Sequence, residues 1–177
     1  AVYLLESETI NSIAIDGGNR KWFGTAKSGA YLQSSDGSKQ ILHFTTNNSP
    51  LPSNNILDIK VHPTTGEVFF ATDEGMVSYR AESTLPYQAF GKVYAFPNPV
   101  RPDFMGVITI AGLMENTTVK ITDIAGNLVY ETKSVGGQAT WDGKNLRGRR
   151  VATGVYLILC SDSSGEQTAT AKVLFVN

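Results

Sequence analysis

The chain has 177 residues, a formal net charge of -1 at pH 7 and 41% hydrophobic residues. This length accommodates one ordinary domain or two small ones. The near-neutral charge excludes a general electrostatic attraction to nucleic acid or to an anionic membrane, so we expect no nucleic-acid partner. No apolar run approaches the roughly 20 residues of a membrane-spanning helix. The first residues are Ala-Val-Tyr, without a methionine or a secretory signal, and we therefore expect a processed product or a fragment.

The first half of the chain contains an internal repeat. Residues 22–25 read Trp-Phe-Gly-Thr and precede Gly29, and residues 69–72 read Phe-Phe-Ala-Thr and precede Gly75. The offset is roughly 47 residues, and several short strands per period of about 40–50 residues are typical of propeller blades. Alternating apolar segments at residues 13–16 and 59–62 predict one strand upstream of each copy.

We interpret residues 1–91 as about two blades of an incomplete β-propeller, with residues 87–90 as the outer strand of the second blade. A propeller closes with about 4–8 blades, and isolated blades leave unpaired strand edges. We therefore expect the remaining blades or a second chain to cover the open sheet edge. Residues 22–29, with Leu-Pro-Ser-Asn-Asn-Ile at 51–56, make the region from about residue 11 to residue 80 resemble the two-component-regulator propeller repeat.

The second half has the pattern of a sandwich of short strands. We predict strands near residues 93–96, 107–111, 118–122, 128–132, 138–141, 154–161 and 168–176. Turn signals separate them, for example Ala-Gly-Asn at 125–127 and Asp-Gly at 142–143. Seven strands at this spacing predict an immunoglobulin-like β-sandwich over residues 92–177. The predicted fold class is therefore all-β, with a partial β-propeller followed by this sandwich.

Several stretches of this half resemble the C-terminal sorting domain of proteins that the Bacteroidetes type IX (Por) secretion system exports. They include Phe-Pro-Asn-Pro-Val at 96–100, the segment 119–126 and Lys-Val at 172–173. The resemblance implies a sorting or recognition module whose terminal strand is read by the secretion machinery and its sortase. The sorting-motif residues that it implies are Pro97, Asn98, Pro99, Asp123, Gly126, Gly154, Tyr156, Lys172 and Val173.

A regulator-type propeller followed by this domain resembles the PorZ-like surface components of the same machinery. That resemblance implies a non-enzymatic protein, exported to the outer membrane or cell surface, with anionic lipopolysaccharide as a candidate ligand. Two alternatives remain open. One is a secreted cargo protein with its functional domain upstream, and the other is the periplasmic, glycan-sensing propeller of a two-component regulator.

The residues that could carry chemistry favour structural roles. His43 and His62 are isolated in sequence, and Cys160 ends an apolar strand and cannot form an internal disulfide. The Asp- and Gly-containing turns lack calcium-loop spacing. We expect no catalytic residue, metal or cofactor. The basic cluster Lys144, Arg147, Arg149 and Arg150 is a candidate anion-binding loop because guanidinium groups suit planar anions, and a solvated turn is the alternative.

Overall fold

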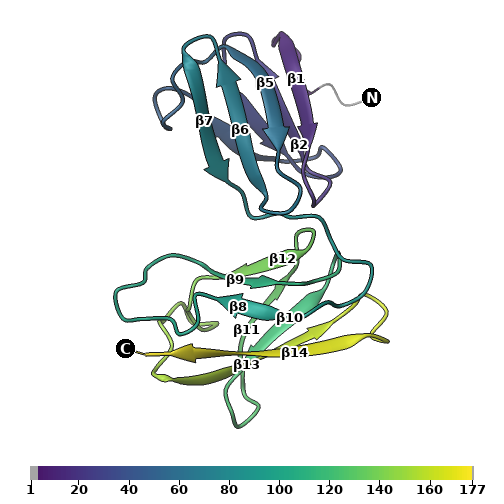
Figure 1. Cartoon of the computed structure of the whole chain (residues 1–177), viewed down its shortest axis with the longest axis vertical. Coiled ribbons are helices and arrows are strands. Elements are labelled where there is room, and N and C mark those ends of the chain that lie inside the picture. The colour runs from purple at the N-terminus through teal and green to yellow at the C-terminus, as the bar shows by residue number, and fades with distance from the viewer. Residues whose placement is uncertain (1–3, 177) are drawn as a thin grey trace. The chain divides into compact units, whose positions relative to one another are not determined.

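The computed structural model describes residues 4–176, so the first three residues and Asn177 lie outside the described part. Every regular element in this part is a β-strand, and none of its segments is a helix long and apolar enough to cross a membrane. The chain forms two compact units, Ala1–Leu85 and Pro86–Asn177 (Figure 1). The boundary expected after residue 91 falls a few residues downstream of this division.

The first unit contains two antiparallel sheets, one for each copy of the sequence repeat (Figure 1). The first sheet has the order β1-β2-β3-β4 and comprises β1 (Ile10–Ile15), β2 (Lys21–Thr25), β3 (Ala30–Gln33) and β4 (Gln40–Phe44). The second has the order β5-β6-β7 and comprises β5 (Ile56–Val61), β6 (Glu67–Thr72) and β7 (Gly75–Arg80). The predicted pair of partial propeller blades is confirmed.

An aromatic cluster holds the two blades together. Trp22 is fully buried, and its ring lies 5.3 Å from the ring of Phe70 and 5.9 Å from that of Phe44, between centroids. Tyr79 of β7 contacts the same cluster at 6.2 Å from Trp22. Trp22 of the first copy and Phe70 of the second hold different positions in the repeat, and they face each other between the blades, where large flat side chains bury much apolar area.

Polar side chains join the two inner strands, β1 and β5. The Ser12 hydroxyl donates to an Asp58 carboxylate oxygen at 2.9 Å and accepts the Ile59 N–H at 3.0 Å. The Asn11 amide donates to the Ile56 carbonyl at 3.0 Å. Both strands carry a register shift at the equivalent point, so the repeat extends to the irregularities of the backbone.

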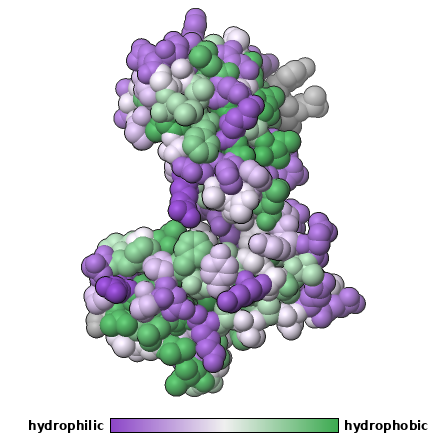
Figure 2. Space-filling model, in the orientation of Figure 1, coloured by the Kyte–Doolittle hydropathy of each residue, from purple (hydrophilic) through white to green (hydrophobic). Residues whose placement is uncertain are grey.

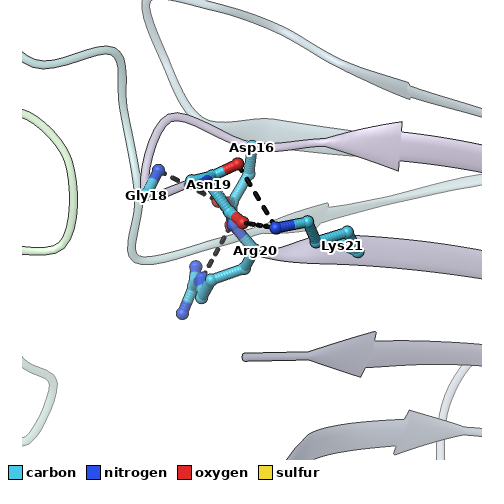
Figure 3. Close-up of polar contacts among 5 residues, drawn as sticks. All are labelled: Asp16, Gly18, Asn19, Arg20 and Lys21. Carbon is cyan, nitrogen blue, oxygen red and sulfur yellow. Dashed lines mark hydrogen bonds and ion pairs between the residues drawn. The ribbon is translucent and has the colours of Figure 1, made fainter. Parts of the chain in front are cut away.

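The turn between β1 and β2 is closed by a buried ion pair (Figure 3). One Asp16 carboxylate oxygen accepts the N–H groups of Gly18 and Arg20, both at 3.0 Å, and the other accepts Nε of Arg20 at 2.7 Å. The Asp16 side chain has no exposed surface. The Asp16 carboxylate, which belongs to a loop that could suggest calcium binding, is thus bonded to groups of the same turn. This confirms the interpretation of the segment as a tight turn.

Two expectations about the first unit need correction. The strand β4 was not predicted from the sequence, and the strand predicted at residues 87–90 is wrong. In that segment the Tyr87 N–H donates to the Leu113 carbonyl at 3.0 Å, and Phe90 packs against the core of the second unit. The second blade consequently has three strands in the described chain, because burial of Phe90 in the sandwich takes the segment away from β7.

The second unit is a sandwich of two antiparallel sheets (Figure 1). One sheet has the order β11-β10-β13-β14 and the other β12-β9-β8. The strands are β8 (Tyr94–Phe96), β9 (Ile108–Ala111), β10 (Thr118–Thr122), β11 (Leu128–Lys133), β12 (Gln138–Trp141), β13 (Gly154–Ser161) and β14 (Thr168–Phe175). All seven predicted strands are confirmed, with ends that agree within one or two residues.

The sandwich has its own apolar core. Trp141 and Phe175 are buried, with ring centroids 5.0 Å apart, and Tyr156 lies edge-on to both. Cys160 is 3% exposed, and burial raises its thiol pKa to about 11. The thiol therefore stays protonated at neutral pH, which confirms that Cys160 is a small core residue rather than a reactive group.

The Asp16–Arg20 pair gives a direct stability test. We expect Asp16→Ala to destabilise the first unit by about 3–5 kcal/mol, because it leaves the Arg20 guanidinium buried without its counter-ion. Urea unfolding followed by Trp22 fluorescence measures the loss. Asp36→Ala is the matched control, since Asp36 caps a similar turn in solvent, and it should have a much smaller effect. Equal effects of the two substitutions would contradict the assignment.

Candidate functional site

The terminal strand β14 lies at the edge of its sheet. It pairs on one side with β13, in a register that runs from Gly154 opposite Phe175 to Ser161 opposite Thr168. Val173 and Phe175 point into the core and are fully buried, while the alternate side chains are exposed. The terminal strand therefore meets the condition for recognition through its backbone, which is that it lies at a sheet edge.

The segment 97–100, which we call the clasp, covers the outer edge of β14. The Asn98 side-chain amide donates to the Lys172 carbonyl and accepts the Leu174 N–H, both at 3.0 Å. The Val100 N–H donates to the Leu174 carbonyl at 2.8 Å, and the Val176 N–H donates to the Val100 carbonyl at 2.9 Å. Asn98 thus presents its amide to β14 as a neighbouring strand presents a peptide group.

The clasp divides β14 into two halves. The outward backbone groups of residues 172–176 are bonded to Asn98 and Val100, whereas residues 168–171 have no neighbouring strand on the outer side within the described chain. In the described chain, only the first half of β14 therefore has an outer backbone edge without a neighbouring segment.

Most of the sorting-motif residues meet around the covered half of β14. Pro97 and Pro99 flank Asn98, and Asn98 is bonded to the backbone beside Val173. Two further motif residues lie on the adjacent strand β13: Tyr156 pairs with Val173, and Gly154 pairs with Phe175. The Tyr156 hydroxyl donates to the Ala152 carbonyl at 2.9 Å, and burial is the main cause that raises its pKa.

Asp123 and Gly126 are not part of this assembly. They form the turn between β10 and β11, and β13 and β14 lie on the other side of β10 in the sheet order. The Asp123 carboxylate accepts the Asn127 side-chain amide at 2.8 Å and backbone N–H groups at 2.9 Å, and these bonds lower its pKa. Gly126 has a φ of 88°, which favours glycine. Both residues therefore shape a hairpin turn.

The basic loop does not present four free cations. The Lys144 ammonium lies 3.1 Å from Asp142, and the Arg150 guanidinium donates to the Arg101 carbonyl and stacks 5.9 Å from the Phe175 ring centroid. Arg147 and Arg149 project from a turn that the Asn145 side chain holds, and neither has an acidic partner among residues 4–176. Anion binding stays a prediction, now narrowed to these two arginines.

The two histidines have local roles. The His43 ring stacks on Tyr31 at 3.9 Å between centroids, with Nε2 2.7 Å from the Ser28 carbonyl oxygen. Nδ1 of His62 accepts the N–H groups of Thr64 and Thr65. In the part of the chain that the structure describes, no three or more His, Cys, Asp or Glu side chains gather as a metal site would require.

Sequence reasoning missed the backbone partners that complete the clasp, Val100 and Leu174. It also missed the contact that brings the basic loop to the end of β14, where a Cβ on Gly143 would lie 3.1 Å from the Phe175 ring. The Pro-Asn-Pro motif marked the position of Asn98. Nothing in the sequence indicated which strand it would bond.

Comparison with known proteins finds similarity for both units of the chain. The model of the FlgD Ig-like domain family matches residues 104–166, within the sandwich. The structure of PorZ, a surface component of the type IX secretion system of Porphyromonas gingivalis, is 35% identical with a TM-score of 0.66. The match covers 99% of this chain and 24% of the PorZ chain, so this chain spans about a quarter of the PorZ length. No curated protein sequence matches the chain.

Two further structures share less with this chain. Latent PorU from Porphyromonas gingivalis is 23% identical with a TM-score of 0.36, over 62% of this chain and 12% of its own. The extracellular domain of a one-component system from B. thetaiotaomicron is 11% identical with a TM-score of 0.35, over 99% and 26%. At these values neither carries an argument, and the similarity to PorZ is the comparison that we use.

The clasp predicts a graded response to substitution of Asn98. Asn98→Ala removes both side-chain bonds and should cost about 1–2 kcal/mol, and hydrogen exchange of the Leu174 amide should accelerate. Asn98→Asp keeps an acceptor for Leu174 but loses the donor to Lys172, so its effect should be intermediate. Amide exchange measured by NMR distinguishes the variants. A Leu174 amide that exchanges at the same rate in all three proteins would show that the clasp does not hold β14.

Proposed function

We propose that this chain is part of a non-catalytic, exported component of the type IX secretion machinery, with residues 92–177 as its sorting or recognition module. The observation that carries the proposal is the 35% identity to PorZ over 99% of this chain, across both the blades and the sandwich. PorZ is a surface component of that system, so we propose the cell surface as the destination. That the full protein resembles PorZ beyond this chain, and has a similar role, is part of the same proposal.

We infer that the terminal strand is the element that the machinery reads. An edge strand can be recognised by addition of another strand, whose main-chain bonds supply affinity while alternate side-chain pockets supply specificity. The first half of β14 offers such an edge, and its exposed side chains Thr168 and Thr170 alternate with Ala169 and Ala171. Strand addition would begin there.

In this proposal, an incoming strand would displace the clasp from the second half of β14. Asn98 contributes two hydrogen bonds at an exposed position, so an incoming strand can replace them one for one. Lys172 is exposed, while Val173 is buried against the core. In this proposal Lys172 is read by the partner and Val173 keeps the strand in register.

Surface delivery tests the proposal in the bacterium that encodes the protein. We expect deletion of residues 172–177 to leave the full-length protein in the periplasm, as measured by fractionation and surface labelling. Because Val173 and Phe175 belong to the core, this deletion can also unfold the sandwich. Lys172→Glu is therefore the decisive variant, since it changes an exposed side chain and leaves the core intact; we expect at least a several-fold drop in surface protein.

Glu166→Ala, in the exposed turn between β13 and β14, is the matched control and should reach the surface normally. Normal delivery of both the deletion and Lys172→Glu would refute a sorting role for the terminal strand. A catalytic domain elsewhere in the full protein, with delivery still dependent on Lys172, would instead identify a cargo protein.

A further inference from the structure

The four-stranded sheet of the sandwich has an outer face, turned away from the core, that carries apolar side chains. Its strand β13 reads Val-Tyr-Leu-Ile-Leu-Cys at residues 155–160, and Tyr156, Ile158 and Cys160 belong to the core. An antiparallel sheet with one face in water alternates apolar and polar residues, whereas continuous apolar runs are typical of strands that are covered on both faces. The sequence of β13 is therefore that of a strand with a second covering layer.

The strand register places the outward residues of this face in rows, because residues paired directly across strands lie on the same face. The first row, across β11, β10, β13 and β14, is Leu128, Thr122, Leu157 and Lys172. The second row is Glu131, Lys120, Leu159 and Thr170. Beyond the first row, Val155 pairs with Leu174. We call the five apolar residues of these rows the outer patch: Leu128, Val155, Leu157, Leu159 and Leu174.

The outer patch reaches solvent. Val155 is 40% exposed and Leu159 is 39% exposed, and Leu157 lies between them on β13, partly buried. Hydrophobic residues at the surface of the second unit, next to hydrophilic ones, are visible in Figure 2. Single exposed apolar residues are ordinary, but a contiguous group on one face marks an interaction surface.

A polar atom without a partner lies within the outer patch. Thr122 is buried, and its hydroxyl has no hydrogen-bond partner in the described chain. In the first row it lies between Leu128 and Leu157. Buried polar groups nearly always have a partner. This face therefore favours an occupant that brings polar acceptors together with apolar groups.

The charged side chains on this face are mostly cationic. Lys120 and Lys172 lie on the two strands that flank β13, and Lys133 follows on β11, paired with Thr118. Glu131 is the one acidic residue in the two rows, and none of the three lysines has an ion-pair partner among residues 4–176. The face is thus complementary to an apolar surface that is bordered by carboxylates.

The spacing of the lysines fits an α-helix. Neighbouring strands are about 4.8 Å apart, so the strands that carry Lys120 and Lys172 are about 10 Å apart. A helix with its side chains is about 10–12 Å across, and an amphipathic helix has polar residues on both borders of its apolar stripe. A helix laid along β13 would place its stripe on the outer patch and its borders at the two lysines. Helices packed on a sheet face are one of the common layer arrangements.

Two other occupants fit this face less well. A second copy of this chain would bring three lysines and one glutamate against the same set, so like charges would oppose the contact. A membrane binds apolar groups that reach below the headgroups. The residues of the outer patch are at most 44% exposed and lie on a sheet between lysines, so they do not protrude in this way.

The regular elements of residues 4–176 are all strands, so the described chain offers no helix to cover this face. We propose that the outer face of the four-stranded sheet docks an amphipathic helix of a partner protein, with an apolar stripe bordered on both sides by glutamate or aspartate. This surface is additional to the edge of β14, and its binding does not depend on the export role proposed above.

The test uses the whole chain, labelled with ¹⁵N, and a synthetic amphipathic helix with a leucine stripe bordered by glutamate. A peptide of about 18 residues matches the length of β13, which has 8 residues and spans about 27 Å. We expect saturable shifts of the amides of β13 and of its neighbours β10 and β14, with a Kd in the micromolar to millimolar range. The amides of β8 and β12, in the other sheet, should not move.

Two substitutions, each with a matched control, define the surface. Leu159→Ser should weaken peptide binding about fivefold or more, whereas Leu146→Ser, at an exposed leucine outside the outer patch, should leave it unchanged. Lys120→Glu should weaken binding by a similar factor and should strengthen binding of a lysine-bordered version of the peptide. Lys92→Glu makes the same charge change before β8, outside the two rows, and should do neither. A dispersed spectrum checks that each variant is folded.

Four results would overturn the proposal. They are the absence of shifts at about 1 mM peptide, equal binding by Leu159→Ser and Leu146→Ser, equal binding of both peptides by the parent chain, and self-association of the chain that Leu159→Ser abolishes.

Vesicles of phosphatidylcholine and phosphatidylglycerol provide a separate arm. Co-sedimentation of the chain that Leu159→Ser abolishes, without any peptide binding, would also overturn the proposal and assign the outer patch to a membrane. Peptide binding as expected, together with normal surface delivery of Lys172→Glu, would support this docking surface and count against the sorting role of the terminal strand.

Discussion

The pairing of strand edges is the constraint on which the rest of this structure depends. Every sheet of an all-β chain ends in strands whose outward N–H and C=O groups need a partner or water. The two units meet this requirement differently. The sandwich covers part of its terminal edge with Asn98 and Val100, while no strand pairs with the outer edge of β7 among residues 4–176. Within the described chain, the sandwich therefore has a partly covered edge and the second blade an open one.

The same constraint connects the fold to the proposed function. An edge that is covered by a side-chain amide is protected from unwanted strand addition, yet it can be opened by exchanging a few exposed bonds. The clasp brings Asn98 to Lys172 and Val173 although these residues are more than 70 positions apart in the sequence. The two ends of the sandwich unit are thus one physical site. In our proposal, which rests on the similarity to PorZ, the secretion machinery binds this site.

Much of the fold was predictable because the strands are alternating or continuous apolar segments separated by Gly- and Asn-containing turns. All seven sandwich strands and most blade strands follow from this pattern. The segment 87–90 is also rich in apolar residues, but burial of Phe90 against the sandwich core decides its position, and a local pattern cannot reveal that contact. The bonds from Asn98 to Lys172 and Leu174 were unpredictable for the same reason. In the basic loop, neighbouring positions in the sequence suggested four cations that act together. In the structure one of them, Lys144, pairs with Asp142.

Hydrogen exchange in the unmodified chain tests the central claim most directly, because it compares the two edges in one sample. The account predicts that the Leu174 amide, bonded to Asn98, is protected to the level of the sandwich strands, while the Ser78 amide exchanges at close to the rate of an exposed backbone group. Equal protection of the two amides would contradict it, because the edge of β7 would then be covered without any further strand.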